Sequence, residues 1–159
     1  MATTTPHRIP FGLPLAGSSG GCFAGPDTLC AAPEKTVFSC QCKSKLASVC
    51  ASSDKGRLAY VQYRFGTSIS EIAIPPKHPF DLGLVSGQVS SGAHGDSEII
   101  VFRSGKYSYR IQTSWEMRNA KYNSAKIQVS KDEKVISHFE CKPMASLGRD
   151  NEGLPPRSG

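Results

Sequence analysis

The sequence predicts an all-β fold, a small antiparallel β-barrel or sandwich of about eight short strands, at residues 34–143. Apolar and polar residues alternate with a period of two along most of this region, as in strands with one buried face. Short turns that contain Gly, Asp or Pro separate the alternating stretches. No long segment shows the 3.6-residue period of an amphipathic helix. These observations favour antiparallel sheets with one apolar face and one face in water.

Residues 106–115 (KYSYRIQTSW) show the clearest alternation in the chain. The aromatic and aliphatic residues take the odd positions, and Arg110 and Gln112 take even ones. Residues 98–103 (EIIVFR) form a short apolar run just before this strand. Because a two-residue connection with glycine is typical of a hairpin, Ser104-Gly105 is expected to be the turn between them.

The other predicted strands are short and end at residues that favour turns. Pro75-Pro76 ends one of them, because proline cannot donate a backbone hydrogen bond to the ladder. Residues 84–89 would add a short ninth strand. The six remaining strands are expected at residues 36–42, 46–51, 58–65, 69–74, 125–130 and 135–142.

A segment rich in glycine and proline, Pro75 to Ser97, is predicted to be mainly a long loop. A loop of this length in a compact domain is usually functional or disordered. We therefore expect it to contact a binding partner, through Ser91, Gly92, His94 and Asp96.

The two ends of the chain lack the strand pattern. Residues 1–33 are rich in Pro, Gly, Ser and Thr, and they are predicted to be a disordered arm or a degraded export signal. Residues 144–159 are predicted to be a disordered tail. No run approaches the ~18 apolar residues that a membrane helix needs, so no transmembrane segment is expected.

The chain is basic, with a formal net charge of +6. Residues 36–143 hold 15 Lys and Arg against nine Asp and Glu, so this charge belongs to the predicted domain. A basic domain attracts polyanions such as nucleic acid, anionic lipid or acidic proteins and glycans. The charges are scattered singly, which is also typical of an ordinary soluble surface.

Three of the six cysteines, Cys40, Cys42 and Cys50, fall within eleven residues. Their spacing matches neither a zinc ribbon nor a CxxC redox pair, so neither a metal site nor a cofactor is predicted. Disulfides are favoured instead. A hairpin turn centred on Lys45 would place Cys40 opposite Cys50, whereas Cys141 on the last strand would be able to pair with either of them.

A hydrolase is one alternative function. His94, Asp96 and Ser97 are the residue types of a hydrolytic triad. Four consecutive loop positions rarely supply the geometry of a triad, and no GxSxG elbow is present. A hydrolase that uses His94 is therefore the weaker hypothesis, and an enzyme is not expected.

Nucleic-acid binding is a second alternative. Tyr60, Gln62 and Arg64 alternate along one predicted strand and would be able to share a polar face with Arg110 and Gln112. Aromatic and basic side chains on a sheet can stack single-stranded nucleic acid. The signature of an RNA-recognition motif is absent, so nucleic acid is not the favoured partner.

Several segments resemble a family of small exported bacterial proteins of unknown function. The matching segments include Phe38-Ser39-Cys40, QYRFG at residues 62–66 and Phe139-Glu140-Cys141, and the resemblance covers residues 36–142. It implies export, which agrees with disulfides. The cysteines outside its pattern are Cys22, Cys30 and Cys42, and the last of these is expected to be a spare thiol.

A weaker similarity is to the periplasmic inhibitors of c-type lysozyme, which are small β-barrels with an inhibitory Ser-Gly-x-x-Tyr loop. The sequence Ser91-Gly92-Ala93-His94-Gly95 lies in a comparable place, with glycine where the tyrosine belongs. The similarity implies an inhibitor-like role, although the missing tyrosine argues against the inhibitory activity of that loop.

The sequence thus leads to one main hypothesis. It predicts an exported, periplasmic or secreted, non-enzymatic β-domain that binds a protein or glycan of the cell envelope in an inhibitor-like or immunity-like role. The disulfide candidates are Cys40, Cys50 and Cys141. The expected binding residues are Tyr60, Gln62, Arg64, Ser91, Gly92, His94 and Asp96.

Overall fold

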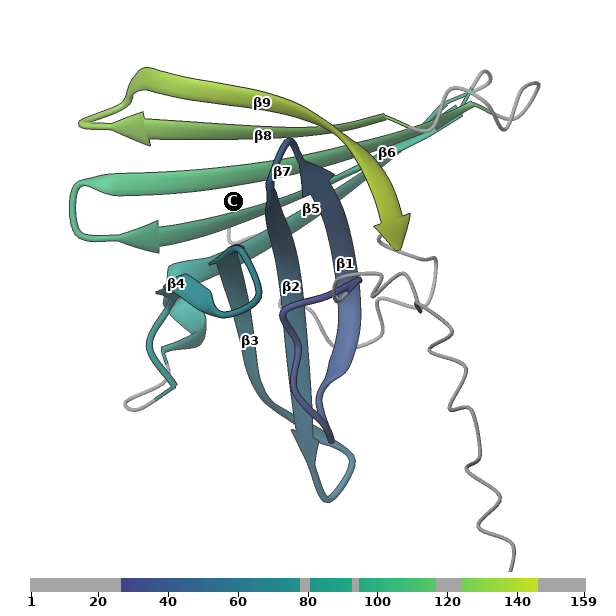
Figure 1. The fold of residues 1–159 in the computed structure, drawn as a ribbon, viewed down its shortest axis with the longest axis vertical. Helices are drawn as coiled ribbons and strands as arrows, with labels where there is room; N and C mark the ends of the chain where they lie inside the picture. Colours follow the sequence, from purple (N-terminus) through teal and green to yellow (C-terminus); the bar gives the residue numbers. More distant parts are fainter. Residues whose placement is uncertain (1–26, 78–80, 93–94, 117–123, 146–159) are drawn as a thin grey trace, which may run out of the picture.

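The computed structural model describes residues 27–77, 81–92, 95–116 and 124–145, which fold into β-strands with no α-helix (Figure 1). The all-β prediction is confirmed, and the ninth strand is present. The elements are β1 Lys35–Cys42, β2 Lys45–Asp54, β3 Arg57–Gly66, β4 Ser70–Ile74, the 3-10 turn η1 Leu82–Leu84, β5 Val85–Gly92, β6 Gly95–Ser104, β7 Tyr107–Glu116, β8 Ser124–Lys131 and β9 Lys134–Ala145.

The strands form two antiparallel sheets, which we call sheet A and sheet B. Sheet A holds β1 to β4 and sheet B holds β5 to β9, in the order β4-β3-β2-β1 and β9-β8-β7-β6-β5. The long strand β9 pairs with β8 along most of its length and then with β1 near its end, so it joins the two sheets (Figure 1). The end strands β4 and β5 do not pair with each other. The fold is therefore sandwich-like and not a closed barrel.

Tight turns connect most neighbouring strands. Lys55-Gly56 and Asp132-Glu133 both have positive φ at their two central residues. Positive φ at both positions matches the right-handed twist of the flanking strands. Between β6 and β7 the turn is Gly105-Lys106, one residue later than predicted, and Gly105 supplies the positive φ of 54°.

The long loop predicted between Pro75 and Ser97 is largely a hairpin instead. Strands β5 and β6 pair from Val85↔Phe102 to Gly92↔Gly95. Strand β5 (VSGQVSSG) is rich in Gly and Ser, so its own sequence favours a strand only weakly. Its pairing with the apolar β6 overrides that local preference.

The core lies between the two sheets and follows the predicted alternation. Phe38, Val49 and Tyr63 face inward from sheet A and are buried against residues of sheet B such as Phe102. The Tyr63 ring lies 5.9 Å from the Phe102 ring and 5.5 Å from the Tyr109 ring, measured between centroids. These contacts pack the two sheets face to face.

Two disulfides join different parts of the fold, Cys40–Cys141 and Cys30–Cys50. The alternative pairing of Cys40 with Cys50 is wrong. The first hairpin turns at Lys43-Ser44, which places Cys40 opposite Ala47, and a bulge near Val37 then places Cys50 opposite Thr36. As a result, Cys40 faces the core while Cys50 faces outward, toward Cys30.

The Cys40–Cys141 bond links β1 to β9 across 101 residues of chain. Closing a loop of that length stabilises the folded state by about 4–5 kcal/mol in the chain-entropy model. Cys42 is a free, buried thiol, in agreement with its expected role as a spare cysteine.

Candidate functional site

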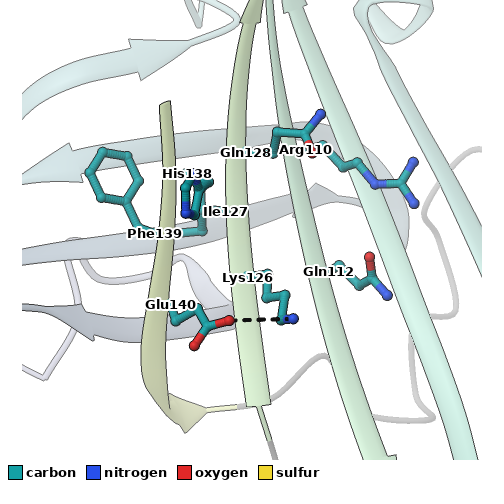
Figure 2. A pocket seen from close by; sticks show the side chains of 8 residues that line it. All are labelled: Arg110, Gln112, Lys126, Ile127, Gln128, His138, Phe139 and Glu140. Atoms are coloured by element: carbon teal, nitrogen blue, oxygen red, sulfur yellow. Dashed lines mark ion pairs between the residues drawn. The ribbon is translucent and has the colours of Figure 1, made fainter. Parts of the chain in front are cut away.

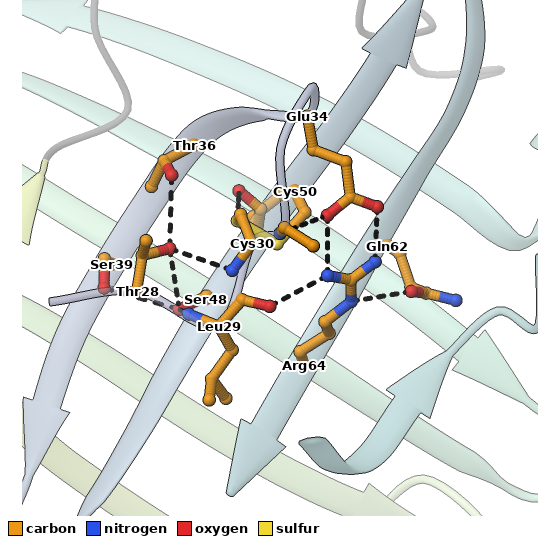
Figure 3. The surroundings of a disulfide bond; sticks show 12 residues. Thr28, Leu29, Cys30, Glu34, Thr36, Ser39, Ser48, Cys50, Gln62 and Arg64 are labelled. Carbon is orange, nitrogen blue, oxygen red and sulfur yellow. Dashed lines mark hydrogen bonds and ion pairs between the residues drawn. A yellow bond between two sulfur atoms is a disulfide. The ribbon is translucent and has the colours of Figure 1, made fainter. Parts of the chain in front are cut away.

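Residues 27–34 cover the outer face of sheet A (Figure 3). The Cys30–Cys50 disulfide ties this segment to β2. Around it, the Leu29 amide donates to Ser48 Oγ at 3.0 Å, and Ser39 Oγ donates to the carbonyl of Asp27 at 2.5 Å. The boundary expected at residue 34 therefore does not separate residues 27–33 from the sheet. We call residues 27–34 the strap.

A buried ion pair holds the end of the strap. The Arg64 guanidinium donates two parallel hydrogen bonds of 2.6 Å to the carboxylate of Glu34 (Figure 3). Both side chains are nearly inaccessible, 7% exposed for Arg64 and 3% for Glu34. Arg64 also donates to the Leu29 carbonyl at 2.8 Å and to Gln62 Oε1 at 2.8 Å. This bidentate, fully hydrogen-bonded geometry is the one in which a buried charge pair is best compensated.

The surroundings of Glu34 favour its ionised form. Burial by itself raises the pKa of the carboxyl, but hydrogen bonds from Arg64, Tyr60, the Ala31 amide and Lys77 outweigh it and hold the pKa far below its usual range. Lys77 Nζ lies 3.0 Å from the carboxylate, and the hydrogen bonds to Glu34 and Tyr60 raise the pKa of the ammonium group. This charged cluster holds the end of the strap against the sheet. We call Glu34, Arg64, Tyr60 and Lys77 the latch.

Two of the expected binding residues, Gln62 and Arg64, are buried under the strap, and a third, Tyr60, is partly buried beside it. Arg64 is 6% exposed and Gln62 is 3% exposed, and Gln62 donates to the Pro75 carbonyl at 2.8 Å. The Tyr60 hydroxyl donates to Glu34. Gln62 and Arg64 are therefore not open to a partner, because the strap covers the sheet face that was expected to lie in water, whereas a partner contact through the partly exposed Tyr60 stays a prediction. It also follows that they share no face with Arg110 and Gln112, which lie on sheet B.

The remaining expected binding residues fall on the β5–β6 hairpin. Ser91 lies opposite Asp96 in the register, and Gly92 lies opposite Gly95, close to the tip. His94 lies outside the described residues. The positions of these side chains are not described, so the contact predicted for this hairpin stays a prediction.

The outer face of sheet B carries a shallow hollow of about 350 Å³ over β7, β8 and β9 (Figure 2). The strand register aligns its polar side chains in two rows across the three strands. One row is Arg110, Gln128 and His138, and the other is Gln112, Lys126 and Glu140. We call these six residues the polar rows.

Some members of the polar rows are paired and others are available. Lys126 and Glu140 form an ion pair at 3.3 Å, with side chains 62% and 74% exposed. An exposed pair of this kind contributes little to stability. Within the described part of the chain, the side chains of Arg110, Gln112 and His138 make no hydrogen bond or ion pair. Their donors and acceptors can therefore meet a ligand without first giving up a protein partner.

Sequence reasoning identified only part of this surface. Arg110 and Gln112 were recognised as polar positions, whereas the four residues contributed by β8 and β9 were missed. Alternation puts Gln128 and His138 on the outer face of their strands, but they meet only because the ladder starts at Lys131↔Lys134 and then shifts at a bulge next to Val129. What was missing was the register between neighbouring strands.

The cysteines also gather in groups that resemble metal-ligand sets. The Sγ atoms of Cys40, Cys42 and Cys141 lie within 4.8 Å of one another, and Cys30, Cys50 and Glu34 form a second group of similar size. Each group contains a disulfide, so at most one thiol or one carboxylate per group is open to a metal ion. Four of the five sulfur atoms are therefore committed to disulfides, and Cys42 keeps a free thiol.

The described strands and surface define a two-sheet antiparallel β-domain with two disulfides, a latched strap on one face and a polar hollow on the other. Among the described residues, no helix has the length and apolar character needed to cross a bilayer. Comparison with protein-family models, with curated proteins and with solved structures found no match for this chain.

Proposed function

We propose that this protein is an exported, non-enzymatic module that binds a protein or glycan of the cell envelope through the polar rows on sheet B. The observation that carries this proposal is the hollow over β7 to β9, where six polar side chains from three strands converge. A rigid sheet holds them at fixed spacing, and sites built on strands position their groups more accurately than sites on loops.

The chemistry of the polar rows suits a ligand with hydroxyl, amide or carboxylate groups. Arg110 offers a planar set of donors that fits a carboxylate in two parallel hydrogen bonds. Gln112 and His138 add further hydrogen-bonding groups beside it. A polar peptide segment or an acidic sugar presents this combination of groups, so both belong to the expected class of partner.

Export is supported by the cysteines. Two disulfides form and persist in oxidising compartments and are rare in the reducing cytosol. One of them bridges the two sheets and the other ties the strap to β2. This favours a periplasmic or secreted location for the proposed binding module.

A binding role fits the hollow better than catalysis. Glu140 is paired with Lys126 and open to water, and His138 is exposed as well. Catalytic side chains usually lie in a partly buried cleft, whereas both of these side chains are exposed to water. The hollow is therefore suited to recognition.

The test is a binding measurement on the folded, oxidised protein with envelope material divided into protein and glycan fractions. Arg110→Gln and His138→Gln are expected to weaken binding at least tenfold, because each removes a group that faces the ligand. The matched control is Lys55→Gln, which removes one positive charge at the exposed β2–β3 turn. Equal binding by all three variants would rule out the polar rows as the site.

The same binding measurement distinguishes nucleic acid from an envelope protein or glycan as the partner. Nucleic acid would bind with an affinity that falls steeply as the salt concentration rises, because phosphate contacts release counterions. The outcome that favours nucleic acid is a single-stranded oligonucleotide bound as tightly as the envelope fraction, with an affinity that falls in this way with salt. That result would identify nucleic acid as the partner in place of an envelope protein or glycan.

A further inference from the structure

Three sulfur atoms lie together where β1 meets β9. Cys40 and Cys141 form the disulfide between the two strands, and Cys42 is a free, buried thiol beside them. All three Sγ atoms lie within 4.8 Å of one another. The Cys42 thiol donates a weak hydrogen bond to the Cys40 carbonyl, with 3.9 Å between sulfur and oxygen. A small movement is thus enough to bring a free thiol against an existing disulfide.

The strand register places Cys42 next to Cys141 across the β1–β9 pair. Cys40 lies opposite Pro143 and Gln41 lies opposite Lys142, so the next position along β1 brings Cys42 opposite Cys141. Directly opposed residues of antiparallel strands have Cα atoms about 4.5–5.5 Å apart, which is within the range that a disulfide spans.

A bond between Cys42 and Cys40 is disfavoured by comparison. The two residues are two positions apart on β1, which corresponds to about 6.6 Å along a strand. That spacing is near the upper limit for a disulfide. Cys141 is therefore the sulfur that Cys42 is placed to attack.

We propose that Cys42 is an internal exchange partner, so that Cys141 forms its disulfide with either Cys40 or Cys42. In the exchange, the Cys42 thiol gives its proton to solvent and the resulting thiolate attacks Cys141 Sγ. The Cys42–Cys141 bond forms as the Cys40–Cys141 bond breaks, and Cys40 leaves as a thiolate that takes up a proton. No electrons are gained or lost, so the exchange needs neither oxidant nor reductant.

Burial keeps this exchange slow. It raises the pKa of the Cys42 thiol to about 11, and the buried Tyr63 side chain lies near enough to interact with it. The attacking thiolate is therefore rare at neutral pH, and one pairing persists for long periods. The alternative bond closes a loop only two residues shorter than the 101-residue separation of Cys40 and Cys141, so the chain entropy of the two bonds is nearly equal. Either bond holds β9 to β1.

The test uses the full oxidised chain with single Cys→Ser variants, digested without reductant after free thiols are blocked in acid. In Cys40→Ser, more than half of the folded molecules are expected to carry a Cys42–Cys141 bond. In the matched control Cys42→Ser, Cys141 is expected to pair with Cys40. Folded Cys40→Ser protein in which Cys42 and Cys141 are both blocked as free thiols would overturn the proposal.

The unmodified protein provides a second measurement that does not depend on the folding of a variant. Samples incubated without reductant and stopped at intervals are expected to gain the Cys42–Cys141 peptide and an equal amount of blocked Cys40. Because only Gln41 separates Cys40 from Cys42, peptide fragmentation between these residues assigns the bond. Cys40 that stays fully bonded while Cys42 stays fully free at every interval would also overturn the proposal.

Discussion

At the scale of the residue, Glu34 joins the end of the strap to β3 of sheet A. Its carboxylate receives hydrogen bonds from Arg64, Tyr60 and the Ala31 amide, and it forms an ion pair with Lys77. The sequence shows Glu34 only as one acidic residue at the edge of a Pro-rich segment. Its role depends on a contact with Arg64, 30 residues away. A contact between positions this far apart cannot be recognised from the sequence alone.

Replacing Glu34 with Gln should destabilise the fold by about 3 kcal/mol, because it leaves the buried Arg64 charge uncompensated. Chemical denaturation of the oxidised protein measures the change. The matched control is Glu71→Gln, which removes the exposed carboxylate that pairs with Lys45 and should cost less than about 1 kcal/mol. Equal losses of unfolding free energy in the two variants would contradict the conclusion that the buried Glu34–Arg64 pair stabilises the fold.

The latch also predicts how stability depends on pH. The pKa of Glu34 is lower in the folded protein than in the unfolded chain, so the ionised carboxylate stabilises the folded state above its ordinary pKa of 4.5. That contribution is lost progressively as the pH falls below about 5. Denaturation at several pH values should show a steeper loss for the native protein than for Glu34→Gln. Parallel curves would mean that Glu34 is not the titrating group.

At the scale of elements, the turn after β3 explains the glycine of the QYRFG segment. A Cβ on Gly66 would lie 2.1 Å from the Ile69 carbonyl oxygen and 2.9 Å from the Glu71 amide nitrogen. Both are backbone atoms of the turn and of β4, so they cannot swing aside as a side chain would. The glycine is required by close approach of the backbone.

Gly66→Ala should therefore destabilise the protein by about 3 kcal/mol, which is typical of a forced backbone shift. Gly105→Ala is the comparison, because its Cβ meets no atom within 4 Å and the cost comes only from its positive φ. That cost is about 1 kcal/mol. Thermal or chemical denaturation ranks the two variants, and a smaller loss at Gly66 would show that the turn can relax.

At the scale of the whole molecule, the two sheets are joined by β9, by the Cys40–Cys141 disulfide and by the core between their inner faces. Phe102 lies at the centre of that core and is fully buried, whereas its neighbour Val101 faces outward on the same strand. The alternation along β6 thus divides the sheet into a packing face and an open face.

Truncating Phe102 to Ala should cost about 3–5 kcal/mol, because it leaves a cavity beside Tyr63 that the two sheets cannot close. Val101→Ala, one residue away, should cost less than about 1 kcal/mol since its side chain is only partly buried. Chemical denaturation gives the free energy of unfolding of each variant, and Phe102→Ala should lose more of it than Val101→Ala. A small loss at Phe102 would mean that the sheets are held mainly by their covalent link.

The alternation of apolar residues, as in residues 106–115, was sufficient to predict the strands, the inner face and the antiparallel class, because side chains on a strand repeat every two residues. It could not predict the strap, because the Cys30–Cys50 bond and the Glu34–Arg64 pair join positions whose separation carries no periodic signal. It also missed the four residues that β8 and β9 contribute to the polar rows, because alternation places Gln128 and His138 on a face without saying which strands are neighbours. The sequence alone determined which residues face the core, and the tertiary structure decided which of the two outer faces is covered and which is open to a partner. The physical reason is that a side chain's direction is set locally, whereas its exposure depends on which distant segment packs against it.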